Sequence, residues 1–148
     1  MDEIDYRLIN DLISDSRTSY AELGRRYNLS RVAIRDRINH LIETGVIEKF
    51  TIVVNPEKLG KHVSAFFEVD VEPHKLNEVA TALAEHDAVL SIYLMTGPST
   101  LHVHALLEDN QSLERFVHES IYSLPGVTRV ESHLVLTRYK NRRGGLRI

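Results

Sequence analysis

Six arginines within residues 17–40 are the side chains of this sequence best suited to binding chemistry. The same stretch carries only two carboxylates, Glu22 and Asp36, which leaves a local excess of four positive charges in a chain of net charge −3. A guanidinium group is planar and offers forked donors that match a phosphate or the edge of guanine. The pattern indicates contact with nucleic acid; the alternative is an ordinary charged surface exposed to solvent.

The spacing of capping residues predicts that this stretch forms two helices joined by a short turn. Ser19, three residues before Glu22, is typical of the reciprocal capping box that begins a helix. Asn28 tolerates the left-handed backbone of a tight turn, and Ser30 is a good cap for the following helix. Apolar residues at spacings of four and three form the buried face of that second helix: Ile34, Ile38 and Leu41.

The opposite face of the second helix is expected to be exposed. Two helices joined by a turn of this length are typical of the DNA-binding helix-turn-helix, whose second helix enters the major groove. A helical hairpin with a solvated charged face is the alternative that this pattern leaves open. The residues predicted on the exposed face are Ser30, Arg31, Val32, Arg35, Asp36 and Asn39.

Bulk composition excludes several classes of protein. The absence of cysteine excludes disulfides, a thiolate metal site and a thiol nucleophile. No apolar run is long enough to predict a membrane span, and the acidic N-terminal residues do not fit a secretory or transit peptide. We therefore expect a cytoplasmic protein that uses no cofactor, no metal and no catalytic residues, and that has no membrane partner.

Charge is segregated along the chain. Residues 51–137 carry five Lys or Arg and twelve Asp or Glu, a difference of seven negative charges. An acidic body joined to a basic patch predicts two modules with different partners. The boundaries that we expect are a DNA-binding domain at 1–50, a connecting strand or linker at 51–63, a second domain at 64–140 and a basic tail at 141–148.

Two further elements are predicted around the paired helices. Residues 2–14 have an apolar side and an acidic start, which favours a helix capped by Asp2. Residues 46–54 are rich in β-branched side chains and favour β structure, either a wing beside the DNA helices or a connecting strand. Asn55-Pro56 is expected to end that run.

From Ser64 onward the pattern becomes that of an α+β domain. Strands are predicted from Ser64 and at 89–95, 101–107 and 127–139, with helical apolar stripes at 76–83 and 113–121. The order βαββαβ is the ferredoxin-like layout. In such a domain the helices cover one face of the sheet, so the other face must meet solvent or a partner.

The joint order of these motifs resembles the Lrp/AsnC (leucine-responsive and asparagine-type) transcription regulators. The resemblance rests on DEIDYRLINDL, SYAELGRRYNLS and ETGVIEKFTIVVNPEKLG, followed by the βαββαβ pattern, and covers nearly the whole chain. It implies a winged helix-turn-helix for double-stranded DNA and a C-terminal domain that pairs subunits and senses small metabolites such as amino acids. It also implies homodimers that assemble into tetramers or octamers and bind palindromic sites.

The resemblance assigns the DNA-binding residues of the second motif helix. We expect Arg31, Arg35 and Asn39 to reach base edges and Ser30 and Arg37 to lie nearer to phosphates, with Val32 also on this surface. Asp36 departs from the family, whose members usually have a basic residue there. It could accept from cytosine, pair with a neighbouring Arg, which is the interpretation we favour, or lower non-specific affinity.

The expected effector loop also departs from the family. Relatives carry Gly-acid-x-acid between the second and third strands, whereas residues 96–100 read Thr-Gly-Pro-Ser-Thr. The carboxylates that would hold an ammonium group are absent from the loop, so an ordinary amino-acid effector is not implied. Gly97, Ser99 and Thr100 are the candidate effector residues, through backbone and hydroxyl groups; the alternative is a protein without an effector.

Histidines and the overall architecture leave other functions open. His102 and His104 share one strand face, and His133 could lie opposite; a subunit interface is favoured over a metal site.

Siroheme decarboxylases resemble the same two-module layout but are enzymes, and a metabolite-binding oligomer silent towards DNA is a third possibility. The outward arginines and the lack of a paired acid or nucleophile favour the regulator.

Overall fold

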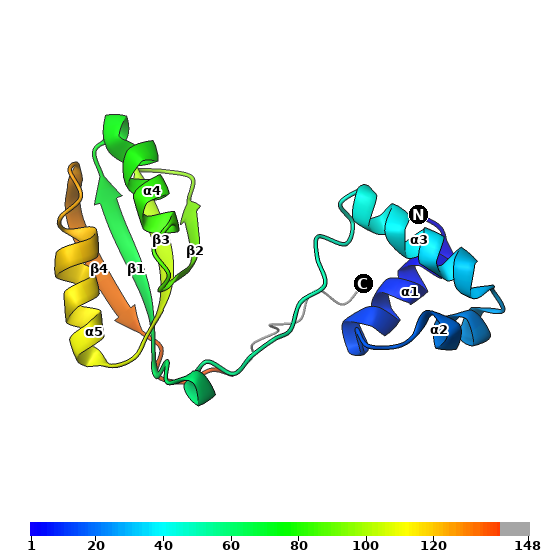
Figure 1. The fold of residues 1–148 in the computed structure, drawn as a ribbon. Coiled ribbons are helices and arrows are strands. Elements are labelled where there is room, and N and C mark those ends of the chain that lie inside the picture. The colour runs from blue at the N-terminus through cyan, green and yellow to red at the C-terminus, as the bar shows by residue number, and fades with distance from the viewer. Residues whose placement is uncertain (140–148) are drawn as a thin grey trace. The chain divides into compact units, whose positions relative to one another are not determined.

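The computed structural model describes residues 1–139, which form two compact units (Figure 1). The first unit contains residues 1–54 and the second contains residues 55–139. The predicted basic tail at 141–148 lies outside the described residues. Within residues 1–139, no helix is long and apolar enough to cross a membrane.

Three helices make up the first unit: α1 (Glu3–Ser14), α2 (Tyr20–Tyr27) and α3 (Arg31–Glu43). The expected cap of the first helix is present, because the Asp2 carboxylate accepts from the Asp5 N–H and the Asp5 carboxylate accepts from the Asp2 N–H. The three helices bury one apolar side each against the others. Their common core consists of Leu8, Leu12, Leu23, Ile34 and Ile38.

The turn between α2 and α3 has the predicted left-handed residue. Asn28 has a φ of 54°, and the Leu29 N–H donates to the Gly24 carbonyl at 2.9 Å. Gly24 is buried, and a Cβ placed on it would lie 2.6 Å from the Leu29 carbonyl oxygen. Glycine is therefore needed here because the turn folds back onto the helix that precedes it.

The β structure predicted at residues 46–54 is not formed, and this expectation was wrong. The Ile47 N–H donates to the Leu41 carbonyl at 2.9 Å, and residues 48–55 then run without a strand pairing. β-branched side chains favour extended backbone, but a strand also requires a neighbour for its ladder hydrogen bonds. Among residues 1–139 no strand pairs with this segment, so the expected wing is absent from the single chain.

The second unit confirms the ferredoxin-like prediction. Its sheet has the order β2-β3-β1-β4 with every neighbouring pair antiparallel. The helices α4 and α5 separate the strands in the order βαββαβ, and α5 continues as a wide π-helical turn over Phe116–Ile121. The element bounds are β1 Val63–Val71, α4 Leu76–Ala84, β2 Val89–Leu94, β3 Thr100–Leu107, α5 Asn110–Arg115 and β4 Val127–Leu134.

The last strand is shorter than the predicted 127–139. Its pairing with β1 stops at Leu134, opposite Ala65, and one further bond joins the Val135 N–H to the Ser64 carbonyl at 2.9 Å. β1 itself begins at Val63, which this register places opposite residue 136, so residues 137–139 have no β1 residue beside them.

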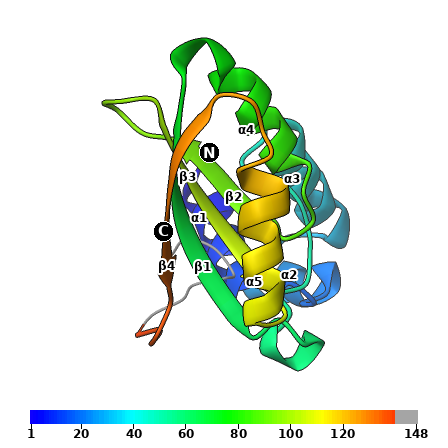
Figure 2. The same ribbon diagram turned by 90° about the vertical axis from the view of Figure 1, so that its left-hand side faces the viewer.

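Both helices of the second unit cover the same face of the sheet (Figures 1 and 2). The core lies between them and the inward residues of the strands, including Phe67, Val69, Val103, Phe116 and Ile121. Successive side chains of β1 and β3 point to opposite faces of the sheet, so the face away from the helices carries every second side chain of these strands. That open face has no covering element among the described residues of this unit.

Candidate nucleic-acid interface

Helix α3 presents one polar face that is positioned by its apolar side. Ile34, Ile38 and Leu41 are fully buried, and they fix the rotation of the helix about its axis. Ser30 caps the first turn, its hydroxyl oxygen accepting from the Ala33 N–H at 3.0 Å. The exposed side chains of the helix include Arg31, Val32, Arg35, Asp36 and Asn39.

Arg35 is bound by its neighbour Asp36. The Arg35 Nε and Nη2 atoms donate to the Asp36 Oδ1 atom at 3.0 and 2.9 Å. Both side chains are more than half exposed, so solvent screens the pair and its net strength is small. The favoured interpretation of Asp36, a pairing within the helix, is confirmed, and Arg35 is held in a bond that it can exchange for another acceptor.

Arg37 joins α3 to the start of α1. Its Nη1 atom donates to the Asp2 Oδ2 atom and to the Asp5 Oδ1 atom, both at 2.8 Å. The hydrogen bond from Asp5 and then that from Asp2 raise the pKa of Arg37. The backbone N–H of Asp5 and the Arg37 guanidinium lower the pKa of Asp2 below its ordinary value of 3.8. The structure places this predicted phosphate ligand in contacts within the domain, away from the set formed by Arg31, Arg35 and Asn39.

Two further arginines of the basic stretch bind carboxylates on α1 and α2. Arg25 donates to Glu22 at 2.9 Å, and Arg26 donates to Asp11 at 3.0 Å. Glu22 thus serves these arginines, and the described structure shows only one half of its expected capping box, in which Ser19 accepts from the Glu22 N–H at 3.1 Å. Among residues 1–139, Arg31 has no side-chain partner, which leaves it available to an external acceptor.

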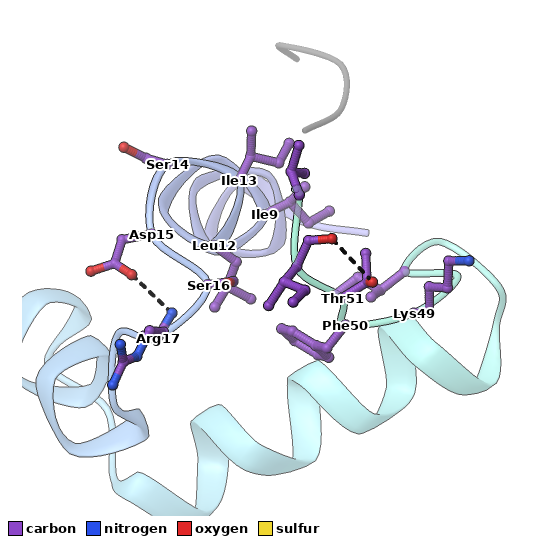
Figure 3. A pocket seen from close by; sticks show the side chains of 13 residues that line it. Ile9, Leu12, Ile13, Ser14, Asp15, Ser16, Arg17, Lys49, Phe50 and Thr51 are labelled. Atoms are coloured by element: carbon purple, nitrogen blue, oxygen red, sulfur yellow. Dashed lines mark hydrogen bonds between the residues drawn. The ribbon is translucent and has the colours of Figure 1, made fainter. Parts of the chain in front are cut away.

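A cavity of about 510 Å³ in the first unit lies between α1 and the segment that follows α3 (Figure 3). Ile9, Leu12 and Ile13 line it from α1, and Lys49, Phe50 and Thr51 line it from the later segment. The side chains of the predicted β run thus flank α1. The cavity contains none of the predicted DNA-binding residues.

The predicted effector residues lie in the turn between β2 and β3, where sequence reasoning missed a neighbour. Gly97 has a φ of 120° and makes the bend. The Thr100 hydroxyl donates to the Asp70 Oδ1 atom at 2.6 Å, and the Ser99 carbonyl accepts from the Val71 N–H at 2.9 Å. A carboxylate from β1 therefore lies beside a loop that has none of its own. The strand pairing of Asp70 with Thr100 was the signal that could have identified it.

The open sheet face gathers the histidines around one aromatic ring. His104 and His133 are the two partners of Phe66, on β3 and β4 respectively. The rings of Phe66 and His104 stack with centroids 4.2 Å apart, and burial, with a smaller effect of Arg138, lowers the pKa of His104. Within residues 1–139, no group of three or more His, Asp or Glu side chains could hold a metal ion.

Comparison with known proteins identifies both domains. The AsnC-type helix-turn-helix domain model matches residues 1–42, and the Lrp/AsnC ligand binding domain model matches residues 64–144. The regulator Ptr1 of Methanocaldococcus jannaschii is 33% identical over 95% of this chain and 95% of its own length. The regulator LrpA of Pyrococcus abyssi is 34% identical over 95% of this chain and 99% of its own length.

A solved structure supports the same fold. A Neisseria meningitidis transcriptional regulator in complex with L-Met superposes with a TM-score of 0.90 at 24% identity, covering 99% of this chain and 96% of that one. The sequence relatives are named as regulators of transcription, which sets aside the decarboxylase alternative. The chain therefore belongs to the Lrp/AsnC family and is a helix-turn-helix transcriptional regulator, not an enzyme.

Proposed function

We propose that the chain reads a palindromic DNA site through the exposed face of α3, as a dimer or a larger assembly of dimers. The observation that carries the proposal is the set of Arg31, Arg35 and Asn39, which share one exposed face of an N-capped helix whose other face is buried. Arginine and asparagine are the side chains that pair in two-point fashion with guanine and adenine edges. Ser30 and Val32 flank this face, and Arg37 contributes by fixing α3 to α1.

The proposed pairing of subunits uses the open sheet face of the second unit. Phe66 lies on this face and is 47% exposed. The sheet face that the helices leave open must meet solvent or a partner. A second copy of the chain would supply the second reading helix, since one helix reads few base pairs and twofold pairing doubles the footprint.

A small metabolite is proposed as the modulator, bound at the turn of Gly97, Ser99 and Thr100. Asp70 supports this assignment because it places a carboxylate beside a loop that has no acid of its own. That carboxylate lies 3.6 Å from the Arg129 guanidinium, so a bound ammonium group would compete with Arg129 for it. The Neisseria neighbour binds L-Met, which supports an amino acid or a similar compound as the ligand class.

The experiment is an electrophoretic mobility assay with the duplex that lies upstream of the protein's own gene. We expect tight binding to that duplex, weaker binding to a scrambled duplex of equal length, and affinity that falls steeply as salt rises. Equal affinity for both duplexes at every salt concentration would contradict sequence-specific reading. A retarded band that matches one subunit per site would contradict the dimer.

A further inference from the structure

A second cavity, of about 350 Å³, lies within the second unit and contains none of residues 96–100. It is bounded by the turn between α4 and β2, the end of β3, and α5 with the π-helical turn that follows. Leu107 and Phe116 supply apolar wall, and both are at least 95% buried. Apart from Ala88, the remaining wall is polar and charged, whereas empty cavities left by packing are apolar.

The π-helical turn at Phe116–Ile121 forms part of this wall. The Tyr122 N–H donates to the Val117 carbonyl, five residues back, at 2.9 Å. Such wide turns are rare in helices and occur frequently at functional sites, because they move a side chain off the regular helical positions. Here the turn brings Glu119 and Ser120 to the cavity.

At the opposite wall, a hydrogen bond fixes which ring nitrogen of neutral His86 carries the hydrogen. Its Nδ1 atom accepts from the Ala88 N–H at 3.1 Å, so the neutral ring carries its hydrogen on Nε2, which lies 3.2 Å from the Ser120 Oγ atom. The edge of the ring also contacts Phe116, with centroids 4.8 Å apart. The Ser120 hydroxyl therefore accepts from His86 and keeps its own hydrogen for a ligand.

In the described part of the chain, three charged side chains of the wall, Asp87, Arg115 and Glu119, form no ion pair with one another. Arg115 and Glu119 are four residues apart, a spacing at which opposite charges on a regular helix usually pair, yet the described residues show no ion pair between them. The partner of the Arg115 Nη2 atom is the Ser112 hydroxyl, at 3.3 Å. Among residues 1–139, Asp87 and Glu119 have no ion-pair partner, whereas Lys61 is paired with Glu108 at 3.2 Å.

We propose that this cavity binds a small zwitterion, with its carboxylate on Arg115 and the Ser120 hydroxyl and its ammonium group on Asp87 and Glu119. One unpaired cation and two unpaired carboxylates around a partly apolar cavity are complementary to a compact molecule that carries both charges. The cavity contains none of the proposed DNA-binding residues and none of residues 96–100. A failure of this proposal would therefore leave the proposed function unaffected.

The test is thermal unfolding of the full chain with the twenty common L-amino acids as probes, each at millimolar concentration. A ligand of the folded state raises the melting temperature. We expect at least one amino acid to do so, while its amide, which lacks the carboxylate, and its deaminated acid, which lacks the ammonium group, do not. Absence of any stabilising amino acid, or equal stabilisation by a singly charged analogue, would overturn the proposal.

Variants then separate the two candidate sites. Arg115→Gln and Glu119→Gln are each expected to weaken the affinity for that amino acid at least about tenfold, with unchanged affinity for DNA in its absence. Glu114→Gln, which removes an exposed carboxylate of α5 outside the cavity, is the matched control and is expected to leave the affinity unchanged. Affinity that is lost with Ser99→Ala, in the loop between β2 and β3, and kept by both charge variants would assign the ligand to the loop and refute this site.

Discussion

At the scale of single residues, we propose that Arg35 and Asp36 set the balance between specific and non-specific DNA binding. Arg35→Ala is expected to reduce the free-energy difference between the proper site and a scrambled duplex by about 1–3 kcal/mol, because a forked donor to a base edge is lost. Fluorescence anisotropy titrations measure this. Arg25→Ala removes an arginine from α2 that is also exposed, and is the control. Equal loss of discrimination in both variants would contradict the assignment of Arg35.

Asp36→Asn is expected to act in the opposite direction. The substitution frees Arg35 from its ion pair and removes a negative charge from the face that meets phosphate. We therefore expect tighter binding of the scrambled duplex, most clearly at low salt, where exposed charges are least screened. Unchanged affinity for the scrambled duplex at low salt would show that Asp36 does not oppose non-specific binding.

The lowered pKa of Asp2 makes the stability of the first unit depend on pH. A carboxylate whose pKa is lower in the folded than in the unfolded state stabilises the fold above its unfolded value of 3.8. That contribution is lost as the pH falls through the lower folded value. Asp2→Asn keeps a good capping side chain but removes the charge that binds Arg37.

We therefore expect the wild-type chain to be more stable than Asp2→Asn near neutral pH, with the difference disappearing in strong acid. Denaturant unfolding followed by circular dichroism across the acid range measures this. Glu3→Gln, which removes a nearby exposed carboxylate paired with Arg7, is the control. A difference between wild type and Asp2→Asn that is constant across the acid range would contradict the role given to the ion pair.

At the scale of elements, the turn between α2 and α3 is the most sensitive position. Gly24→Ala is expected to destabilise the first unit by about 1–3 kcal/mol, because the added Cβ meets the Leu29 carbonyl oxygen and the turn must open. Thermal unfolding measures this loss. Ala21→Gly, at an exposed position of the same helix, is the control for helix propensity, which accounts for about 1 kcal/mol at most. A loss of stability no larger than that caused by Ala21→Gly would show that the turn accommodates the added Cβ at little cost.

Local signals predicted the elements that depend on local chemistry. Ser30, Asn28 and Asp2 each have the capping or turn role that their residue type predicts, because these bonds reach only three or four residues along the chain. The alternation along β1 and β3 predicted the two sheet faces for the same reason. Residues 46–54 were mispredicted because β propensity says nothing of whether a neighbouring strand exists.

Contacts between distant residues set the limits of prediction at the candidate site. Arg37 binds carboxylates 35 and 32 residues away, and no spacing rule could distinguish it from Arg31 or Arg35. Asp70 reaches the effector loop only through strand pairing. The residue type therefore predicted that arginine on this helix would bind an anion, but not whether the anion belongs to DNA or to the protein itself.

At the scale of the whole molecule, the basic stretch and the acidic body of the chain lie in different units. Residues 17–40 hold the basic surface, and residues 51–137 hold the acidic body. An acidic domain repels DNA phosphate, so DNA contact is favoured at the basic surface of the first unit. This division explains how a chain of net charge −3 can bind a polyanion.

The most direct measurement is the salt dependence of binding to the upstream and scrambled duplexes, for the wild-type chain and for Arg31→Ala/Arg35→Ala/Asn39→Ala. These substitutions leave the buried face of α3 and the Arg37 contacts in place, and thermal unfolding is the check that the triple variant folds. We expect the wild type to prefer the upstream duplex and the triple variant to bind both duplexes with equal, weaker affinity and a shallower salt slope. A folded triple variant that keeps the wild-type preference for the upstream duplex would contradict reading through this face of α3.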